Sequence, residues 1–401
     1  MNNTIFTKIN YYLICLLPAL LLTGPLLNNL NISLISIFFI IDLIIKKKIK
    51  ILFNKNFYYL LIIYLYFVLN SIFISENLSS IIKALAFIRF ILLAYALNFY
   101  LRQFQKKILK IWKIIFFIVT FDIIFEYIFG YNILGFSAGY PGRIASFTND
   151  ELIIGGFYFG FIFLVLGSIK SDNKKLLIIF SIVFFIVAFL IGERSNFIKI
   201  FLMYFLFVVF FSNLSSILKA TLVLMMFLSV LLIISSSTVF KGKYVQHIFL
   251  EKYSQKIYIP KTKLALLKHN KHFAHYYTSY LILKDNKIFG SGFRTFRYES
   301  FKEKYKIHKN LINTGSTHPH QLHFELLSDL GILGYFLVIL NFLRVLLDKR
   351  KNEFNHLQTG SKLFLIASLI PILPGGSFFS TFNATIFWLN YAFLIYNKEH
   401  K

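Results

Sequence analysis

Apolar segments of membrane-spanning length, separated by short connections rich in lysine and arginine, run through most of this 401-residue sequence. A helix needs about 20 apolar residues to cross the hydrocarbon core of a bilayer, within a range of roughly 17 to 25. With 57% hydrophobic and only 15% charged residues, the chain is too apolar for a soluble domain of this length. The sequence therefore predicts an all-α, polytopic integral membrane protein.

We expect about twelve transmembrane helices, several of them short. They lie near residues 11–29, 31–45, 57–74, 81–101, 111–129, 151–169, 176–192, 197–211, 217–240, 321–347, 362–374 and 378–396. The predicted organisation is helices 1–9 over residues 1–240, one large loop over 241–319, and helices 10–12 with a tail over 320–401.

The orientation follows from the connections, because positive charge is retained on the cytoplasmic side. Stretches such as "KKKIKILFNK" and "RQFQKKILK" alternate with "NNLN", "SENLSS" and "PGGS", which carry no lysine or arginine. We therefore expect both termini in the cytoplasm and the large loop between helices 9 and 10 outside.

The formal charge of +26 does not indicate nucleic-acid binding, because much of the excess lies in these topological connections. The large loop is also basic, although long loops are exempt from the charge rule. An anionic ligand, the membrane surface or compositional drift would each explain it. Cys15 is the only cysteine, which excludes intrachain disulfides and thiolate metal clusters.

Two arginines lie in short outer connections where the charge rule disfavours them: Arg143 in "YPGRIASF" and Arg194 in "IGERSNF". A guanidinium fork makes two parallel hydrogen bonds to a phosphate, so both are candidates for binding pyrophosphate. The alternatives are local ion pairs, of Arg194 with Glu193 and of Arg143 with Asp150 or Glu151, or an Arg194 side chain that reaches the outer headgroups.

Arg89 is predicted deeper, within the fourth span, where an ionisable group faces the protein and needs a partner. Asp122 and Glu126 are candidates, because they lie four residues apart on one face of the fifth span. A structural salt bridge is the favoured interpretation. The alternative is that Arg89 forms the floor of an outward-facing polar cavity.

The stretch "STHPHQLHFELLSDLGILGY" carries His318, His320 and His323 just before a long apolar segment. Their spacing differs from that of common zinc sites, so a metal site is the weaker interpretation. His320 is expected at the N-terminal end of a helix, whose dipole lowers a histidine pKa and favours the neutral, proton-accepting form. Glu325 and Asp329, four residues apart, are candidates to orient a histidine or reach Arg194.

This stretch, as "HPHQLHFELLSDLGILGYFLVIL", resembles the H-x-H-N-x-x-L-x-x-x-x-E-x-G-x-x-G signature of the O-antigen ligase and O-antigen polymerase superfamily. Upstream, "YLILKDNKIFGSGFRTFRYESF", "GRIASFTNDELIIGGF" and "IGERSNFIKIF" are similar to further segments of that family. Gln321 stands where the family usually has asparagine, and Lys287 where it often has proline.

The resemblance implies an enzyme of the bacterial inner membrane, with its active site facing the periplasm. It would move a glycan from an undecaprenyl-pyrophosphate carrier to an acceptor sugar hydroxyl, with no cofactor or metal. The acceptor would be the lipid A core for a ligase or a carrier-linked repeat for a polymerase. A lipid-linked oligosaccharide transporter and a non-catalytic scaffold are the alternatives from other classes.

In this interpretation His320 and Arg194 are catalytic, and Arg89, Asp122 and Glu126 support the site. The expected substrate-binding residues are Arg143, Arg294, Arg297, His323 and Glu325. Gly290 and Gly292, in "GSGFRTFRY", would permit a tight turn before the two loop arginines. That loop would close over the donor or guide the glycan.

Overall fold

The structure is a computed structural model that describes residues 4–75, 77–137, 139–140, 142–148, 151, 153–169, 174–212, 214–236, 271–305, 315–348 and 355–395. Every regular element in these ranges is a helix, and they contain no strand. This confirms the predicted all-α class. The chain forms two compact units: unit 1, Met1–Lys113 with Leu267–Lys401, and unit 2, Ile114–Leu266.

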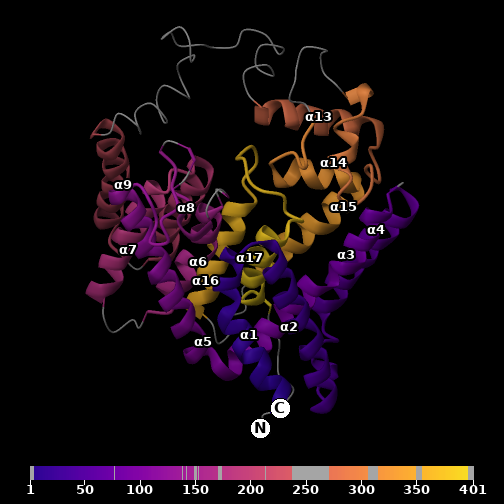
Figure 1. Ribbon diagram of the computed structural model, residues 1–401, viewed down its shortest axis with the longest axis horizontal. Helices are drawn as coiled ribbons and strands as arrows, with labels where there is room; N and C mark the ends of the chain where they lie inside the picture. The colour runs from indigo at the N-terminus through magenta and orange to yellow at the C-terminus, as the bar shows by residue number, and fades with distance from the viewer. Residues whose placement is uncertain are drawn as a thin grey trace. The chain divides into compact units, whose positions relative to one another are not determined.

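Unit 1 combines the first helices of the chain with the last (Figure 1). Its helices are α1 (Ile5–Leu22), α2 (Pro25–Ile45), η1 (Ile49–Ile51), α3 (Lys55–Phe73), α4 (Leu78–Ala86), the first part of α5 (Ile88–Phe129), α13 (Lys271–Asp285), α14 (Phe296–Glu299), η5 (Glu303–Tyr305), α15 (Leu322–Leu347), α16 (Asn355–Ser368) and α17 (Thr381–Ala392).

Unit 2 is formed by the middle of the chain. Its helices are the second part of α5, η2 (Ser146–Thr148), α6 (Ile154–Gly167), α7 (Lys174–Leu190), α8 (Arg194–Leu206), the π-helical η3 (Phe207–Phe211) and α9 (Ser216–Ser236).

In the described part of the chain, five helical segments are long and apolar enough to cross a membrane. They are Ile5–Leu22, Pro25–Ile45, Lys55–Phe73, Arg194–Phe211 and Leu322–Leu347, and three shorter apolar helices cover Ile154–Gly167, Lys175–Leu190 and Ser216–Leu232. The total of twelve spans and the large outer loop stay predictions. Much of that loop, residues 241–270 and 306–314, lies outside the described residues, as do residues 237–240 of the ninth predicted span.

The predicted boundary between the first and second spans is wrong, because the chain turns at Gly24 and not at "NNLN". Gly24 has a φ of 99°, and Pro25 occupies the first position of α2, where its missing N–H costs nothing. The asparagines of "NNLN" lie inside α2, where Asn28 and Asn31 are buried. Asn28 donates to the Thr385 hydroxyl of α17 at 3.3 Å, so these polar side chains face the protein.

The predicted connection "RQFQKKILK" between the fourth and fifth spans contains a kink where two helices meet. It lies within α5, which runs from Ile88 to Phe129 with a single non-helical residue, Phe104 (φ −127°, ψ 20°). The helical conformation is thus interrupted inside the stretch that was predicted to separate the two spans, without glycine or proline.

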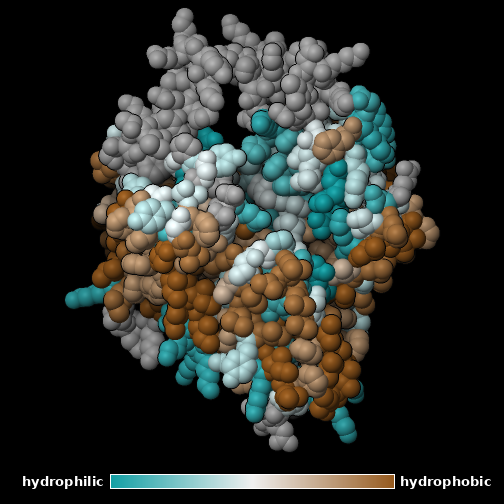
Figure 2. Space-filling view, viewed as in Figure 1, coloured by the Kyte–Doolittle hydropathy of each residue, from teal (hydrophilic) through white to brown (hydrophobic). Residues whose placement is uncertain are grey.

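The core of unit 1 is built from aromatic rings contributed by distant parts of the chain. Phe67 of α3 lies 5.0 Å from Phe293, and Phe293 lies 4.6 Å from Phe379, measured between ring centroids. Figure 2 shows a hydrophobic surface over α1 to α4, whereas hydrophilic side chains gather over α13 and α14. Unit 1 therefore has an apolar body and one polar end.

Candidate active site

The polar end of unit 1 is organised around a break in α15. At Gly331 the main chain leaves the helical conformation, with a φ of 68° and a ψ of −173°. The freed main-chain groups bond to the segment 287–292, which we call the inserted loop. The four bonds are Ser291 N–H to Ser328 O (2.9 Å), Gly292 N–H to Asp329 O (3.0 Å), Ile332 N–H to Lys287 O (2.9 Å) and Leu333 N–H to Ile288 O (3.1 Å).

Glycine is required on both sides of this contact. Gly290 has a φ of 72°, and a Cβ there would lie 2.5 Å from main-chain atoms of Asp329 and Gly331. Helix α3 bonds to two further main-chain carbonyls at this contact. The Tyr66 hydroxyl donates to Leu330 O at 2.6 Å, and the Asn70 amide donates to Phe289 O at 2.6 Å. The turn predicted at Gly290 and Gly292 is present, and it is packed into a helix.

Two carboxylates on α15 are buried beside the break, with Glu325 3% and Asp329 1% exposed. Glu325 accepts hydrogen bonds from the Ser377 hydroxyl and from Phe378 N–H, the latter at 2.7 Å. Asp329 accepts one from Phe296 N–H at 2.8 Å. Both carboxylates therefore hold chain segments in place, and the role of Glu325 in substrate binding stays a prediction.

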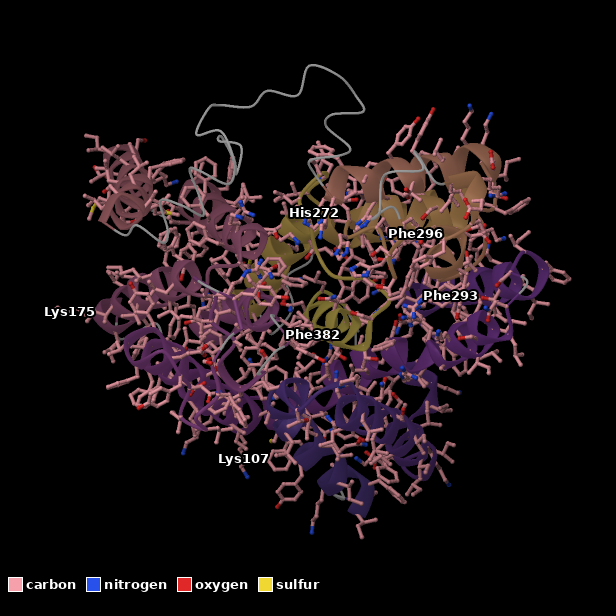
Figure 3. The ribbon with its side chains drawn as sticks, turned by 45° about the horizontal axis from the view of Figure 1, so that its top comes forward. Lys107, Lys175, His272, Phe293, Phe296 and Phe382 are labelled. Atoms are coloured by element: carbon pink, nitrogen blue, oxygen red, sulfur yellow. The ribbon has the colours of Figure 1, made fainter. Side chains whose placement is uncertain are left out.

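The histidines meet in a cluster that joins two parts of unit 1. The His320 ring lies 4.0 Å from that of His318, and 5.3 Å from each of His272 and His275 on α13. Figure 3 labels His272, beside a group of side-chain nitrogen atoms at this end of unit 1. We call His272, His275, His318 and His320 the histidine cluster. In the described residues, His, Cys, Asp and Glu side chains form no group of three or more suited to a metal ion.

His320 lies directly before the N-cap of α15, at the N-terminal end of the helix, as predicted. It has a φ of 59°, and its carbonyl accepts a hydrogen bond from Gly375 N–H at 2.7 Å. The next residue, Gln321, is the N-cap: its side-chain oxygen accepts from Phe324 N–H at 3.1 Å, and its nitrogen donates to Ile370 O at 3.3 Å. Glutamine thus caps this helix although asparagine is the more common cap.

Both histidines that precede α15 are neutral at physiological pH. Burial lowers the pKa of His320 to about 3, and His318, His275 and His272 lower it further. Burial, followed by the neighbouring His275 and Arg297, lowers the pKa of His318 to about 4. The expected direction is therefore correct, but its main cause is burial among other basic groups.

His323 lies one turn into α15 and links that helix to the end of α16. Its Nε2 donates to Leu369 O at 2.8 Å, and its Nδ1 lies 3.0 Å from the Tyr335 hydroxyl. The connection 369–380 after α16 is thus bound by His323, Gln321, His320 and Glu325. From the sequence, only its "PGGS" motif was noticed, as a short outer connection, although its two prolines and two glycines are typical of a longer loop.

The two loop arginines follow the inserted loop. Arg294 has a φ of 58°, and Arg297 lies on α14. Burial lowers the pKa of Arg294, and Arg297 lowers it further, while Glu325 and Asp329 act in the opposite direction. The structure therefore brings Arg294 and Arg297 close to each other and to the two buried carboxylates. Their role as substrate ligands stays a prediction.

Arg89, at the start of α5, donates to the Asn29 side chain of α2 at 2.8 Å and lies over the Phe90 ring. Its predicted partners are in unit 2, where both bond to the loop after α5. Asp122 accepts from Ile133 N–H (2.8 Å) and from the Ser146 hydroxyl (2.5 Å), while Glu126 accepts from Ser146 N–H (2.6 Å) and Ala145 N–H (3.2 Å). The salt bridge with Arg89 stays a prediction.

Within unit 2, the segments that carry Arg143 and Arg194 run side by side, because Ile144 N–H donates to Ile191 O at 3.2 Å. Arg194 is the first residue of α8, and the N-cap before it, Glu193, is buried. Glu193 accepts from Gly155 N–H at 3.1 Å and from the Asn196 side chain at 2.6 Å, so it ties α8 to the start of α6.

None of the curated proteins compared with the chain matches it. A family match covers residues 178–339, which include Arg194, the inserted loop, Arg294, Arg297 and His320, and which end within α15. That family is described as O-Antigen ligase. Residues 178–339 are thus similar to the O-antigen ligase family, as the sequence motifs predicted.

Proposed function

We propose that this protein transfers a glycan from an undecaprenyl-pyrophosphate carrier to a sugar hydroxyl of the lipid A core, at the periplasmic face of the bacterial inner membrane. The observation that carries this proposal is the neutral His320 in the histidine cluster, inside the segment that matches the O-antigen ligase family. A neutral imidazole accepts a hydrogen bond from an attacking hydroxyl, whereas an imidazolium does not.

The donor has a diphosphate leaving group, whose developing charge requires fixed positive partners. We assign this role to Arg194 and Arg143, whose segments are joined by the bond between Ile144 and Ile191. Asp122 and Glu126 support them, since their carboxylates fix the loop that carries Arg143. A guanidinium pair favours a diphosphate over a neutral glycan because each fork makes parallel, charge-assisted hydrogen bonds.

With a pKa of about 3, His320 is neutral before it meets the acceptor hydroxyl. We infer that His320 accepts the proton of the acceptor hydroxyl as that hydroxyl attacks. Arg294, Arg297, His323 and Glu325 complete the substrate-binding region, with Arg89 as support.

The test is glycan transfer in cells that carry His320→Ala, Arg194→Ala or Arg143→Ala. His356→Ala is the matched control, because His356 is an exposed histidine on α16. We expect the first two changes to reduce transfer by at least about 100-fold at equal membrane abundance. Full transfer by both His320→Ala and Arg194→Ala would refute the mechanism.

A polymerase shares the donor chemistry and differs only in the acceptor, so the readout must separate the two. Loss of a ligase leaves unattached polymer on the carrier, whereas loss of a polymerase leaves a core capped by one repeat. Transfer by the purified protein in detergent, with no bilayer to cross, would exclude a transporter.

A further inference from the structure

Four basic side chains of unit 1 converge beside the inserted loop. Lys83 is on α4, Arg89 begins α5, Arg294 follows the inserted loop and Arg297 is on α14. Lys83 lies in the electrostatic field of Arg297 and Arg294, and Arg294 lies in that of Arg297 and Arg89. We call these four residues the cationic cluster.

The backbone around the cluster is fixed by contacts of α4 with the segment before α14. The Ser80 hydroxyl of α4 donates to Phe293 O, directly before Arg294. Lys83 lies three residues after Ser80 and therefore on the same face of α4. The Phe87 ring, at the end of α4, lies 6.0 Å from the Phe293 ring. Figure 3 labels Phe293 and Phe296, which flank Arg294 in sequence.

The carboxylates that face the cluster do not neutralise it. Glu325 and Asp329 are the acids that act on Arg294, and four basic side chains against two acidic ones leave a formal excess of two positive charges. Those carboxylates already accept hydrogen bonds from Ser377, Phe378 and Phe296. Glu299, also on α14, pairs with Lys302 at 2.7 Å.

The arginines also have unused donors. The Nε atoms of Arg89, Arg294 and Arg297 are buried, and none has a hydrogen-bond acceptor in the described residues. A buried donor without an acceptor is costly, and so is a concentration of like charge away from water. A bound anion with several oxygen atoms would relieve both costs.

We propose that Lys83, Arg89, Arg294 and Arg297 bind a phosphate group of the lipid-linked acceptor, in addition to the donor diphosphate assigned to Arg143 and Arg194. This proposal rests on the proposed function, because it assigns the cluster to the second substrate of that reaction. Phosphate fits because its charge near −2 matches the excess, and its oxygens accept from planar guanidinium forks.

Such a phosphate has two possible sources, a glycolipid core or a second carrier diphosphate. The experiment measures binding of three probes to the full-length protein in detergent: a phosphorylated lipid A–core glycolipid, the same glycolipid after phosphatase treatment, and a prenyl diphosphate. Arg194→Ala serves as the background, so that the donor site does not contribute. A lower Kd for the glycolipid than for the prenyl diphosphate identifies a ligase-type acceptor, and the reverse order a polymerase-type acceptor.

The variants are Lys83→Gln, Arg297→Gln and the double change Arg294→Gln with Arg297→Gln. The matched control is Lys302→Gln with Lys304→Gln, which removes two charges from the same segment. Those lysines are about half exposed and pair with Glu299 and Asp285. We expect Kd to rise about tenfold or more for each charge removed from the cluster, and to change little in the control. Lys83→Gln alters only a side chain of α4, so it remains informative if the double variant unfolds.

Equal binding of the phosphorylated and phosphatase-treated glycolipids, with no binding of the prenyl diphosphate, would overturn the proposal. Cluster variants that bind every probe as tightly as the lysine control would overturn it too. Because binding is measured without glycan transfer, the phosphate-site proposal and the transfer mechanism can be refuted independently of each other. Phosphate-dependent binding in a protein whose His320→Ala and Arg194→Ala variants transfer normally would refute the mechanism and leave the phosphate site intact.

Discussion

Replacing Gly290 with alanine tests the contact between the inserted loop and α15. The new Cβ would lie 2.5 Å from main-chain atoms of Asp329 and Gly331, and these atoms cannot rotate away as a side chain would. A φ of 72° costs a non-glycine residue about 1–2 kcal/mol. Relief of the clash separates the loop from the helix and leaves at least one buried main-chain group unbonded, at about 1–3 kcal/mol each.

The sum is about 2–5 kcal/mol of unfolding free energy, which corresponds to a fall in Tm on the order of 5–10 °C. The assay is thermal unfolding in detergent, followed with a thiol-reactive fluorophore. Cys15 is the only cysteine of the chain, and it is 2% exposed within unit 1. Its labelling therefore reports the opening of the same unit that contains Gly290.

Gly139→Ala is the matched control, because a Cβ at Gly139 meets no atom within 4 Å. It should leave Tm unchanged or raise it slightly, since alanine reduces the freedom of the unfolded chain. Equal Tm values for Gly290→Ala and Gly139→Ala would show that the inserted loop is not packed into the break of α15.

Three further predictions concern the same region. Tyr66→Phe removes the donor to Leu330 O and should lower stability by about 1 kcal/mol, read as a smaller Tm shift in the Cys15 assay. Gln321→Ala removes the N-cap of α15 at a similar cost of about 1 kcal/mol, whereas Gln321→Asn should retain most of it; equal Tm values for these two variants would contradict the cap. The third is a pH dependence. The pKa values of His318 and His320 are lowered to about 4 and about 3, so between pH 6.5 and 4 the unfolded chain binds more protons than the folded one. Stability should therefore fall as pH drops through this window, and His318→Gln with His320→Gln should flatten the Tm profile between pH 7 and 5; an unchanged slope would count against the burial of these rings.

The sequence predicted α15 almost to the residue, because its apolar run follows a histidine-rich polar stretch that cannot continue into the bilayer. It did not predict the break at Gly331. The main-chain groups freed at the break find their hydrogen-bond partners in residues 287–292, which are distant in sequence. Hydropathy carries no signal for such a contact. A glycine in an apolar helix is only a weak indication of a break.

The candidate site was predicted in part. His320, Arg294 and Arg297 were recognised because charged groups near predicted spans are rare and the family motifs contain them. The contact of His272 and His275 with His320 depends on the packing of α13 against α15, for which the sequence carries no local pattern. Lys83 was not identified, because a single lysine near the end of a predicted span is ordinary.

The break in α15 also bears on how the protein is assembled. A helix that enters the bilayer alone must satisfy its own main chain. Around Gly331, α15 does not, because Ser328, Asp329, Ile332 and Leu333 bond to a segment synthesised earlier. The inserted loop must therefore already lie beside α15 when this helix leaves the translocation machinery. Insertion of this helix and folding of the preceding loop then form a single step, so a defect in the loop would appear first as a failure of biogenesis.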